Sequence, residues 1–97
     1  LTQYVPFHLR AWHAGESSFE DCPACNDYSI GIELEGCDTE PYEQAQYLKL
    51  AAVTKALMTG WPAITRSRIT GHSDIAPHRK TDPGPAFDWE NFYNLID

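Results

Sequence analysis

The stretch from Gly71 to Trp89, GHSDIAPHRKTDPGPAFDW, concentrates reactive side chains and offers little that could form a core. Its nineteen residues include two histidines, three aspartates, an Arg-Lys pair and three prolines. Proline removes backbone donors and fixes φ, so no continuous helix or central strand can join His72 to Asp82, which follows ten residues later. We therefore expect a rigid, folded-back loop on which these two side chains meet.

The residue types in this loop are those of a catalytic metal site. A neutral imidazole and a carboxylate supply two of the three protein ligands of a catalytic zinc site, whose fourth position is kept for water. His72 and Asp82 are the candidate pair, although spacing alone also allows Asp74 or His78 as ligands. Lys80, two residues before Asp82, would place an ammonium beside the metal. A solvated surface loop without a metal is the alternative interpretation.

The same stretch resembles the C-terminal signature of the zinc-dependent N-acetylmuramoyl-L-alanine amidases (amidase type 2), a group that includes the peptidoglycan recognition proteins. Within this family it is most similar to the cytoplasmic anhydro-N-acetylmuramyl-L-alanine amidases of bacterial cell-wall recycling. The resemblance implies that His72 and Asp82 bind Zn²⁺ and that Lys80 stabilises the transition state. It also implies a substrate-binding role for Arg79.

Two blocks in the first third of the chain extend the resemblance. Arg10 to Gly15, RAWHAG, resembles a family block whose tryptophan helps to line the substrate groove. This implies substrate-binding roles for Trp12 and His13, and the later Cys-Asn-Asp run implies one for Asn26. Without the resemblance, Trp12 would be interpreted as a core aromatic and His13 as its hydrogen-bonded neighbour.

Residues 29–36, SIGIELEG, predict a strand because apolar and polar positions alternate strictly. One face consists of three aliphatic residues, Ile30, Ile32 and Leu34, and is expected to pack on a helix. The other face carries Glu33 and Glu35, with a gap at Gly31 where a ligand could approach the backbone. Alternation alone fits a solvated face with two ordinary glutamates. The family resemblance, by contrast, implies that Glu33 is the general base.

Two helices are predicted, from Tyr42 to Thr59 and from Asp88 to Ile96, the second with Asp88 as its N-cap. The first carries an apolar stripe of Tyr47, Leu50, Ala51, Val53, Thr54, Leu57 and Met58; the second carries Trp89, Phe92, Tyr93 and Ile96. Residues 2–7 are expected to form an edge strand, and residues 68–70 a strand-like approach to the loop. We therefore expect an α/β fold, a mixed β-sheet flanked by helices, as in amidase type 2 and the peptidoglycan recognition proteins.

Composition limits the partners. Ninety-seven residues with 42% hydrophobic and 12% aromatic content indicate one folded domain. A formal charge of −7 disfavours nucleic acid and anionic membrane surfaces as partners, and no apolar run is long enough to span a bilayer.

Three cysteines are an odd number for a disulfide framework and favour a reducing compartment. Cys22 and Cys25 form a C-x-x-C that could be a redox pair or half of a zinc site, and ordinary loop thiols are the favoured interpretation.

The resemblance implies Zn²⁺-dependent hydrolysis of the amide between (anhydro-)N-acetylmuramic acid and L-alanine in a muropeptide substrate, in the cytoplasm, with the periplasm or the extracellular space as alternatives. A non-catalytic peptidoglycan-binding module of the same fold is the alternative function. Residues 1–97 are expected to be the C-terminal portion of a single zinc amidase domain. A missing N-terminal segment would supply the further zinc ligand, a histidine, for which His8, His13 and His78 are the available substitutes.

Overall fold

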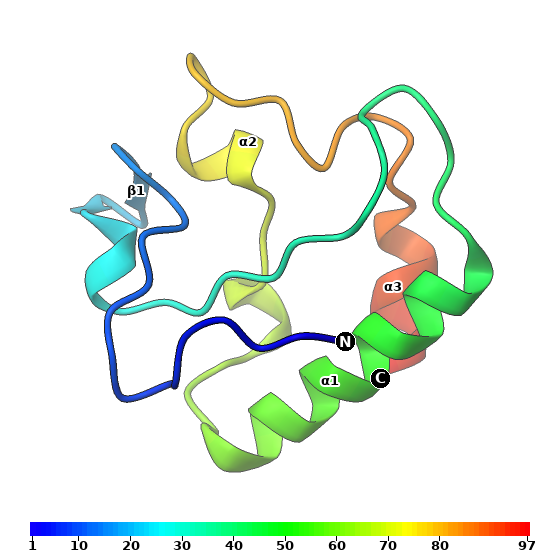
Figure 1. Cartoon of the computed structure of the whole chain (residues 1–97), viewed down its shortest axis with the longest axis horizontal. Helices are drawn as coiled ribbons and strands as arrows, with labels where there is room; N and C mark the ends of the chain where they lie inside the picture. The colour runs from blue at the N-terminus through cyan, green and yellow to red at the C-terminus, as the bar shows by residue number, and fades with distance from the viewer.

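The computed structural model describes all residues, 1–97, and separates a helical end from a small β-hairpin (Figure 1). In chain order the elements are β1 (Ser18–Phe19), β2 (Cys22–Pro23), the 3-10 turn η1 (Cys25–Asp27), α1 (Gln44–Gly60), the 3-10 turn η2 (Arg66–Arg68), α2 (His72–Ile75) and α3 (Trp89–Ile96). The two strands are antiparallel, with Ser18 opposite Pro23. None of the helices combines the length and the apolar character that crossing a membrane requires.

The core lies between α1 and α3, which are side by side in Figure 1. Its buried members are Tyr47, Ala51, Phe87, Phe92 and Ile96. The aromatic rings interlock: the Phe87 centroid is 5.3 Å from that of Tyr47 and 4.7 Å from that of Trp89. Offset and edge-on ring pairs of this kind add to the stabilisation from burial alone. Both predicted helices and their apolar stripes are confirmed, with α1 beginning two residues later than predicted.

Polar contacts fix where the two long helices begin. The Oδ1 atom of Asp88 accepts a hydrogen bond from the backbone N–H of Asn91 at 3.0 Å, which confirms the predicted cap. At the start of α1, the side-chain oxygen of Gln46 accepts from the backbone N–H of Glu43 at 2.8 Å. The Tyr47 hydroxyl accepts from the backbone N–H of Asp88 at 2.8 Å and so ties the start of α3 to α1.

Three strand predictions are wrong in this structure. Residues 2–7 and 29–36 form no strand, and residues 68–70, the first of which ends the turn η2, form none either. No backbone N–H of residues 29–36 donates to another backbone group, because no other segment forms a ladder beside them. Alternation marks a segment that can pair, whereas a strand also needs a neighbour. The sheet is therefore only the β1–β2 hairpin, and the predicted α/β class is met by this small sheet beside the helices.

The apolar face of residues 29–36 is also placed differently from the prediction. Ile30 and Ile32 are 36% and 45% exposed, and only Leu34 packs against the core between α1 and α3. The predicted packing of this face on α1 is therefore wrong for Ile30 and Ile32, and the apolar stripe of α1 packs on α3 instead. The segment instead crosses the molecule from the hairpin to α1 (Figure 1).

The loop before α3 is held closely against the segment before α1. Gly84 has φ +83° and lies so near the chain that an added Cβ would be 2.5 Å from the backbone oxygen of Asp38. The hydroxyl of Thr81 donates to the Asp38 carboxylate, and the Tyr42 hydroxyl donates to the carbonyl of Pro83 at 3.0 Å. These contacts surround Asp82 and fix the backbone that carries it.

We expect Gly84→Ala to destabilise the protein, because a side chain at this φ is strained by about 1–3 kcal/mol before the clash with Asp38 is added. Gly60→Ala is the matched control, since a Cβ at Gly60 meets nothing within 4 Å. Urea unfolding of both variants is the measurement. Equal midpoints for the two variants would contradict this role for Gly84.

Stability should fall in alkaline solution because of two tyrosines at the core. Burial raises the pKa of Tyr42, with added effects from the Asp38 and Asp82 carboxylates, and burial also raises the pKa of Tyr93. The unfolded chain therefore loses these protons first, so stability is complete below about pH 10 and declines as pH rises towards the folded-state values. Urea midpoints measured across this range should decline less steeply in Tyr42→Phe and Tyr93→Phe than in the wild type.

Candidate active site

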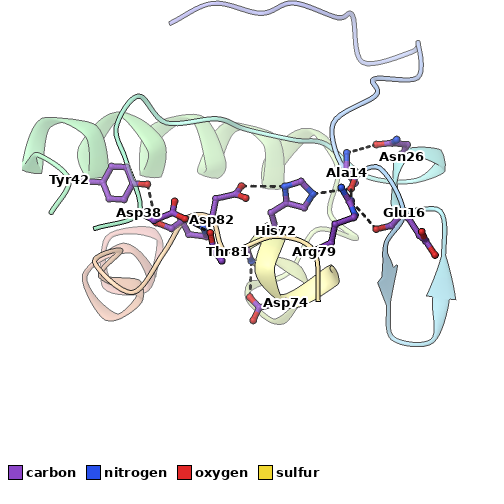
Figure 2. Close-up of polar contacts among 12 residues, drawn as sticks. Ala14, Glu16, Asn26, Asp38, Tyr42, His72, Asp74, Arg79, Thr81 and Asp82 are labelled. Atoms are coloured by element: carbon purple, nitrogen blue, oxygen red, sulfur yellow. Dashed lines mark hydrogen bonds and ion pairs between the residues drawn. The ribbon is translucent and has the colours of Figure 1, made fainter. Parts of the chain in front are cut away.

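His72 and Asp82 meet at the centre of the molecule, between the hairpin and the helical end (Figure 2). His72 is the first residue of α2, and the backbone N–H of Ser73 donates to the carbonyl of Asp82 at 2.9 Å, which folds the loop back on itself. This contact brings the Nδ1 atom of His72 to 3.3 Å from Oδ2 of Asp82. The histidine side chain is 18% exposed and the aspartate side chain 53%.

The other ring nitrogen determines what Nδ1 presents to Asp82. The Nε2 atom of His72 lies 2.9 Å from the carbonyl oxygen of Ala14. A carbonyl only accepts hydrogen bonds, so Nε2 carries the hydrogen, and in a neutral ring Nδ1 then has a lone pair. Two acceptors, Nδ1 and the carboxylate of Asp82, therefore face each other. A metal ion between the two atoms would be bound by both of them.

The separation of these two acceptors fits zinc. Two ligands at about 2.1 Å from a tetrahedral zinc lie about 3.4 Å apart, close to the observed 3.3 Å. Imidazole nitrogen and carboxylate oxygen are both ordinary zinc ligands. No third His, Cys, Asp or Glu joins them within these 97 residues, so the chain offers a two-residue set of ligands.

The alternative ligands from the sequence, Asp74 and His78, have other surroundings. Asp74 Oδ2 accepts from the backbone N–H of Gly71 at 2.9 Å and from the Thr70 hydroxyl at 2.8 Å, so this carboxylate caps the start of α2. His78 is exposed and borders a separate hollow of about 460 Å³ beside the hairpin. Of the four candidate ligands, the structure brings together His72 and Asp82.

The two glutamates of the extended segment line another open hollow, of about 480 Å³. Glu33 and Glu35 both border it, so the structure does not rank them. Lys80 is half-buried and its ammonium has no ion pair. Neither Glu33 nor Lys80 is hydrogen-bonded to the His72–Asp82 pair, and their roles stay predictions.

Trp12 and His13, adjacent in sequence, differ in their surroundings. The Trp12 side chain is 80% exposed, with the Arg10 guanidinium 4.1 Å from its ring centroid, so the core interpretation of Trp12 is wrong. The His13 imidazole lies against Gly31, where an added Cβ would be 2.5 Å from its Cγ. The gap predicted at Gly31 for a ligand is therefore filled by His13, whose Nε2 is 3.2 Å from the Ser29 hydroxyl.

Asn26 and Arg79 both bind the backbone that faces His72. The Oδ1 atom of Asn26 accepts from the backbone N–H groups of His13 at 3.0 Å and Ala14 at 2.8 Å. The Nη2 atom of Arg79 donates to the carbonyls of Ala14 at 2.6 Å and Glu16 at 2.9 Å. Sequence reasoning did not identify Ala14, since its contribution is a carbonyl that every residue type carries.

Of the C-x-x-C cysteines, Cys22 lies in strand β2 of the hairpin and Cys25 in the turn η1, and they are not bonded to each other. Cys25 is buried, with its sulfur 3.2 Å from the Tyr28 hydroxyl, which donates to the carbonyl of Cys22 at 2.7 Å. The hydrogen bond with Cys25 raises the pKa of Tyr28 above its ordinary value, and desolvation adds to the shift. Neither thiol belongs to a group of three potential metal ligands.

Comparison with known proteins adds family evidence to this geometry. The sequence matches the family Amidase_2, described as N-acetylmuramoyl-L-alanine amidase, over residues 1–85. It is 62% identical to the 1,6-anhydro-N-acetylmuramyl-L-alanine amidase AmpD of Enterobacter cloacae, over 99% of this chain and 51% of that protein. The chain thus spans about half the length of this curated relative.

Two solved structures have the same fold. A crystal structure of a selenomethionine derivative of AmpD superposes with a TM-score of 0.93 at 62% identity, covering 98% of this chain and 52% of that one. The amidase AmiD of Escherichia coli, in complex with the substrate anhydro-N-acetylmuramic acid-L-Ala-D-γ-Glu-L-Lys, superposes with a TM-score of 0.90 at 37% identity. That match covers 97% of this chain and 40% of AmiD.

Proposed function

Because this chain belongs to the N-acetylmuramoyl-L-alanine amidase family, we propose that the protein hydrolyses the amide between (anhydro-)N-acetylmuramic acid and L-alanine in peptidoglycan fragments, with Zn²⁺ as cofactor. The observation that carries the proposal is the approach of His72 Nδ1 to Asp82 Oδ2, two acceptors separated by 3.3 Å as two zinc ligands would be. The likeness to AmiD, whose structure holds a muropeptide, supports a muropeptide as the substrate.

In this proposal His72 and Asp82 hold the metal, and a histidine outside these 97 residues completes the usual set of three protein ligands. Bound zinc lowers the pKa of a water towards neutrality and polarises the amide carbonyl. The contact with the Ala14 carbonyl holds the ring of His72, and the contact of Tyr42 with Pro83 holds the backbone next to Asp82.

The other proposed residues transfer a proton, stabilise the charge of the transition state or orient the substrate. The Glu33 carboxylate takes a proton from the attacking water and returns it to the departing nitrogen of L-alanine. The Lys80 ammonium stabilises the negative charge that develops on the carbonyl oxygen. Trp12, whose side chain is exposed, stacks on the substrate.

A non-catalytic peptidoglycan-binding module is the second candidate, and the two-residue set of ligands favours it. Incubation of the intact protein with an anhydromuramyl-tripeptide, followed by mass spectrometry with and without a chelator, separates the two. The enzyme releases free tripeptide, and the chelator stops the release. Retention of the whole muropeptide without cleavage under both conditions would identify the binding module.

We also propose that the reaction takes place in the cytoplasm, as part of cell-wall recycling. The support is the resemblance of the Cys25-to-Gly36 block and of the Ala86-to-Trp89 ending to the cytoplasmic type of amidase. Fractionation of cells that produce the tagged, intact protein tests this location. Recovery of the protein in the periplasm or in the medium would contradict it.

Metal binding should depend on His72 and Asp82 and not on the neighbouring residues of the same types. We expect His72→Ala and Asp82→Ala to lose zinc, measured as metal content after dialysis and by calorimetric titration. His78→Ala and Asp74→Asn are the matched controls and should keep it, since neither side chain lies beside Nδ1 of His72. Zinc loss in a control with retained binding in Asp82→Ala would reverse the assignment.

Glu33→Gln should keep the fold and the metal yet lose activity by about two orders of magnitude or more, as removal of a general base does. Glu35→Gln is the matched control, because it lines the same hollow, and should lose far less. The measurement is kcat with the anhydromuramyl-tripeptide, together with zinc content. Equal losses in the two variants would show that the base is misassigned.

Lys80→Ala should bind zinc as well as the wild type while kcat falls by about a hundredfold, because the lost contact is made in the transition state. Zinc titration and steady-state kinetics on the same preparation measure both. Loss of zinc in this variant would instead make Lys80 a residue that supports a ligand.

A further inference from the structure

A chain of hydrogen bonds runs from the buried side chain of Asn26 to the ring of His72 (Figure 2). Asn26 Oδ1 accepts from the backbone N–H groups of His13 and Ala14, and the carbonyl of Ala14 accepts from His72 Nε2 at 2.9 Å. Asn26 and Ala14 are 6% and 1% exposed. Water therefore has little access with which to replace these contacts.

We propose that Asn26 is a positioning residue for His72, acting through the Ala14 peptide. Its Oδ1 atom holds the two peptide groups that directly precede the Ala14 carbonyl and so restricts the backbone from which that carbonyl extends. That carbonyl keeps the hydrogen of His72 on Nε2 and the lone pair of Nδ1 towards Asp82. This differs from the substrate-binding role that the family resemblance implies for Asn26.

Asn26 is itself well anchored. It lies in the turn η1, where the backbone N–H of Cys25 donates to the Ser17 hydroxyl at 3.2 Å and that of Asp27 donates to the carbonyl of Ala24 at 2.9 Å. The neighbouring Cys25 is 2% exposed and holds the turn by burial. A rigid turn is what allows an amide side chain to set the position of another segment, because its own rotamer has little freedom.

Arg79 supports the same carbonyl from the other side. Its guanidinium donates to Ala14 and Glu16, so the oxygen of Ala14 receives one hydrogen bond from Arg79 and one from His72. A carbonyl oxygen has two lone pairs, and both are used. His72 and Arg79 therefore attach the loop to residues 14–16 at two points. Asn26 contacts the same backbone through the N–H groups of His13 and Ala14.

The direct test is the tautomer of His72 in the metal-free protein. Long-range ¹⁵N–¹H correlation spectra in mildly alkaline buffer, where imidazole is neutral, distinguish Nε2–H from Nδ1–H. We expect the wild type to hold one form, Nε2–H, and Asn26→Ala to give a mixture. Asn26→Asp should restore the single form, because a carboxylate oxygen also accepts both N–H groups. Asn94→Ala, an exposed asparagine on α3 without side-chain hydrogen bonds, is the matched control and should behave as the wild type.

A second readout rests on the proposed zinc site. Competition with a chelator should show zinc held about 10–100-fold more weakly in Asn26→Ala and near the wild-type value in Asn26→Asp, as for other outer contacts of metal ligands. Asn26→Leu keeps the side-chain size without the acceptor and serves if Asn26→Ala does not fold.

The outcomes separate the two proposals. A wild type with hydrogen on Nδ1, or variants without the acceptor that keep both a single tautomer and wild-type zinc affinity, would overturn the positioning role. A tautomer that follows Asn26 as expected in a protein that binds no zinc would support the positioning role and overturn the metal site instead.

Discussion

The hydrogen bond between the carbonyl of Ala14 and Nε2 of His72 joins the segment before β1 to the start of α2, 58 residues later, and so attaches the central loop that lies between the two ends of the molecule. One end is the hairpin with its turn η1, and the other is the core between α1 and α3 (Figure 1). The loop that carries His72 and Asp82 is attached to the hairpin end through Ala14 and to the helical end through Pro83. The candidate site therefore lies where the two attachments hold the loop from both sides.

The geometry of the His72–Asp82 pair cannot come from their mutual attraction. An ion pair of which one member is half exposed contributes about 0–1 kcal/mol, and the Asp82 side chain is 53% exposed. Two acceptors at 3.3 Å would separate if they were free to do so. Backbone contacts at Asp82 and Pro83 bring the two residues together, and a cation between the two atoms would then be held by both.

Features with local signals could be predicted from the sequence. The apolar stripes of α1 and α3 and the cap at Asp88 depend on residues within a few positions of one another. The convergence of His72 and Asp82 followed from the prolines between and just after them, which exclude a regular element. The family resemblance then gave roles that no local pattern could supply.

What could not be predicted depends on segments that are distant in sequence. Strand formation at residues 29–36 needs a neighbouring strand, and alternation says only that the segment is able to pair. The filling of the space at Gly31 by His13 depends on how two irregular segments cross. The contribution of Ala14 is a backbone carbonyl, and its environment is set by Asn26 and Arg79 from two other parts of the chain.

Because of these differences, the fold holds some of the proposed catalytic groups more firmly than others. The ring of His72 is held by the Ala14 carbonyl and the backbone of Asp82 by the N–H of Ser73, whereas Glu33 lies on a segment whose backbone N–H groups make no backbone hydrogen bond. A general base must lie within about 2.6–3.2 Å of the proton it takes, directly or through one water. Whatever binds along residues 29–36, whether the substrate or another strand, therefore decides where that carboxylate lies. The fold described above brings the proposed metal ligands together, whereas the position of the proposed base depends on what pairs with the segment that carries it.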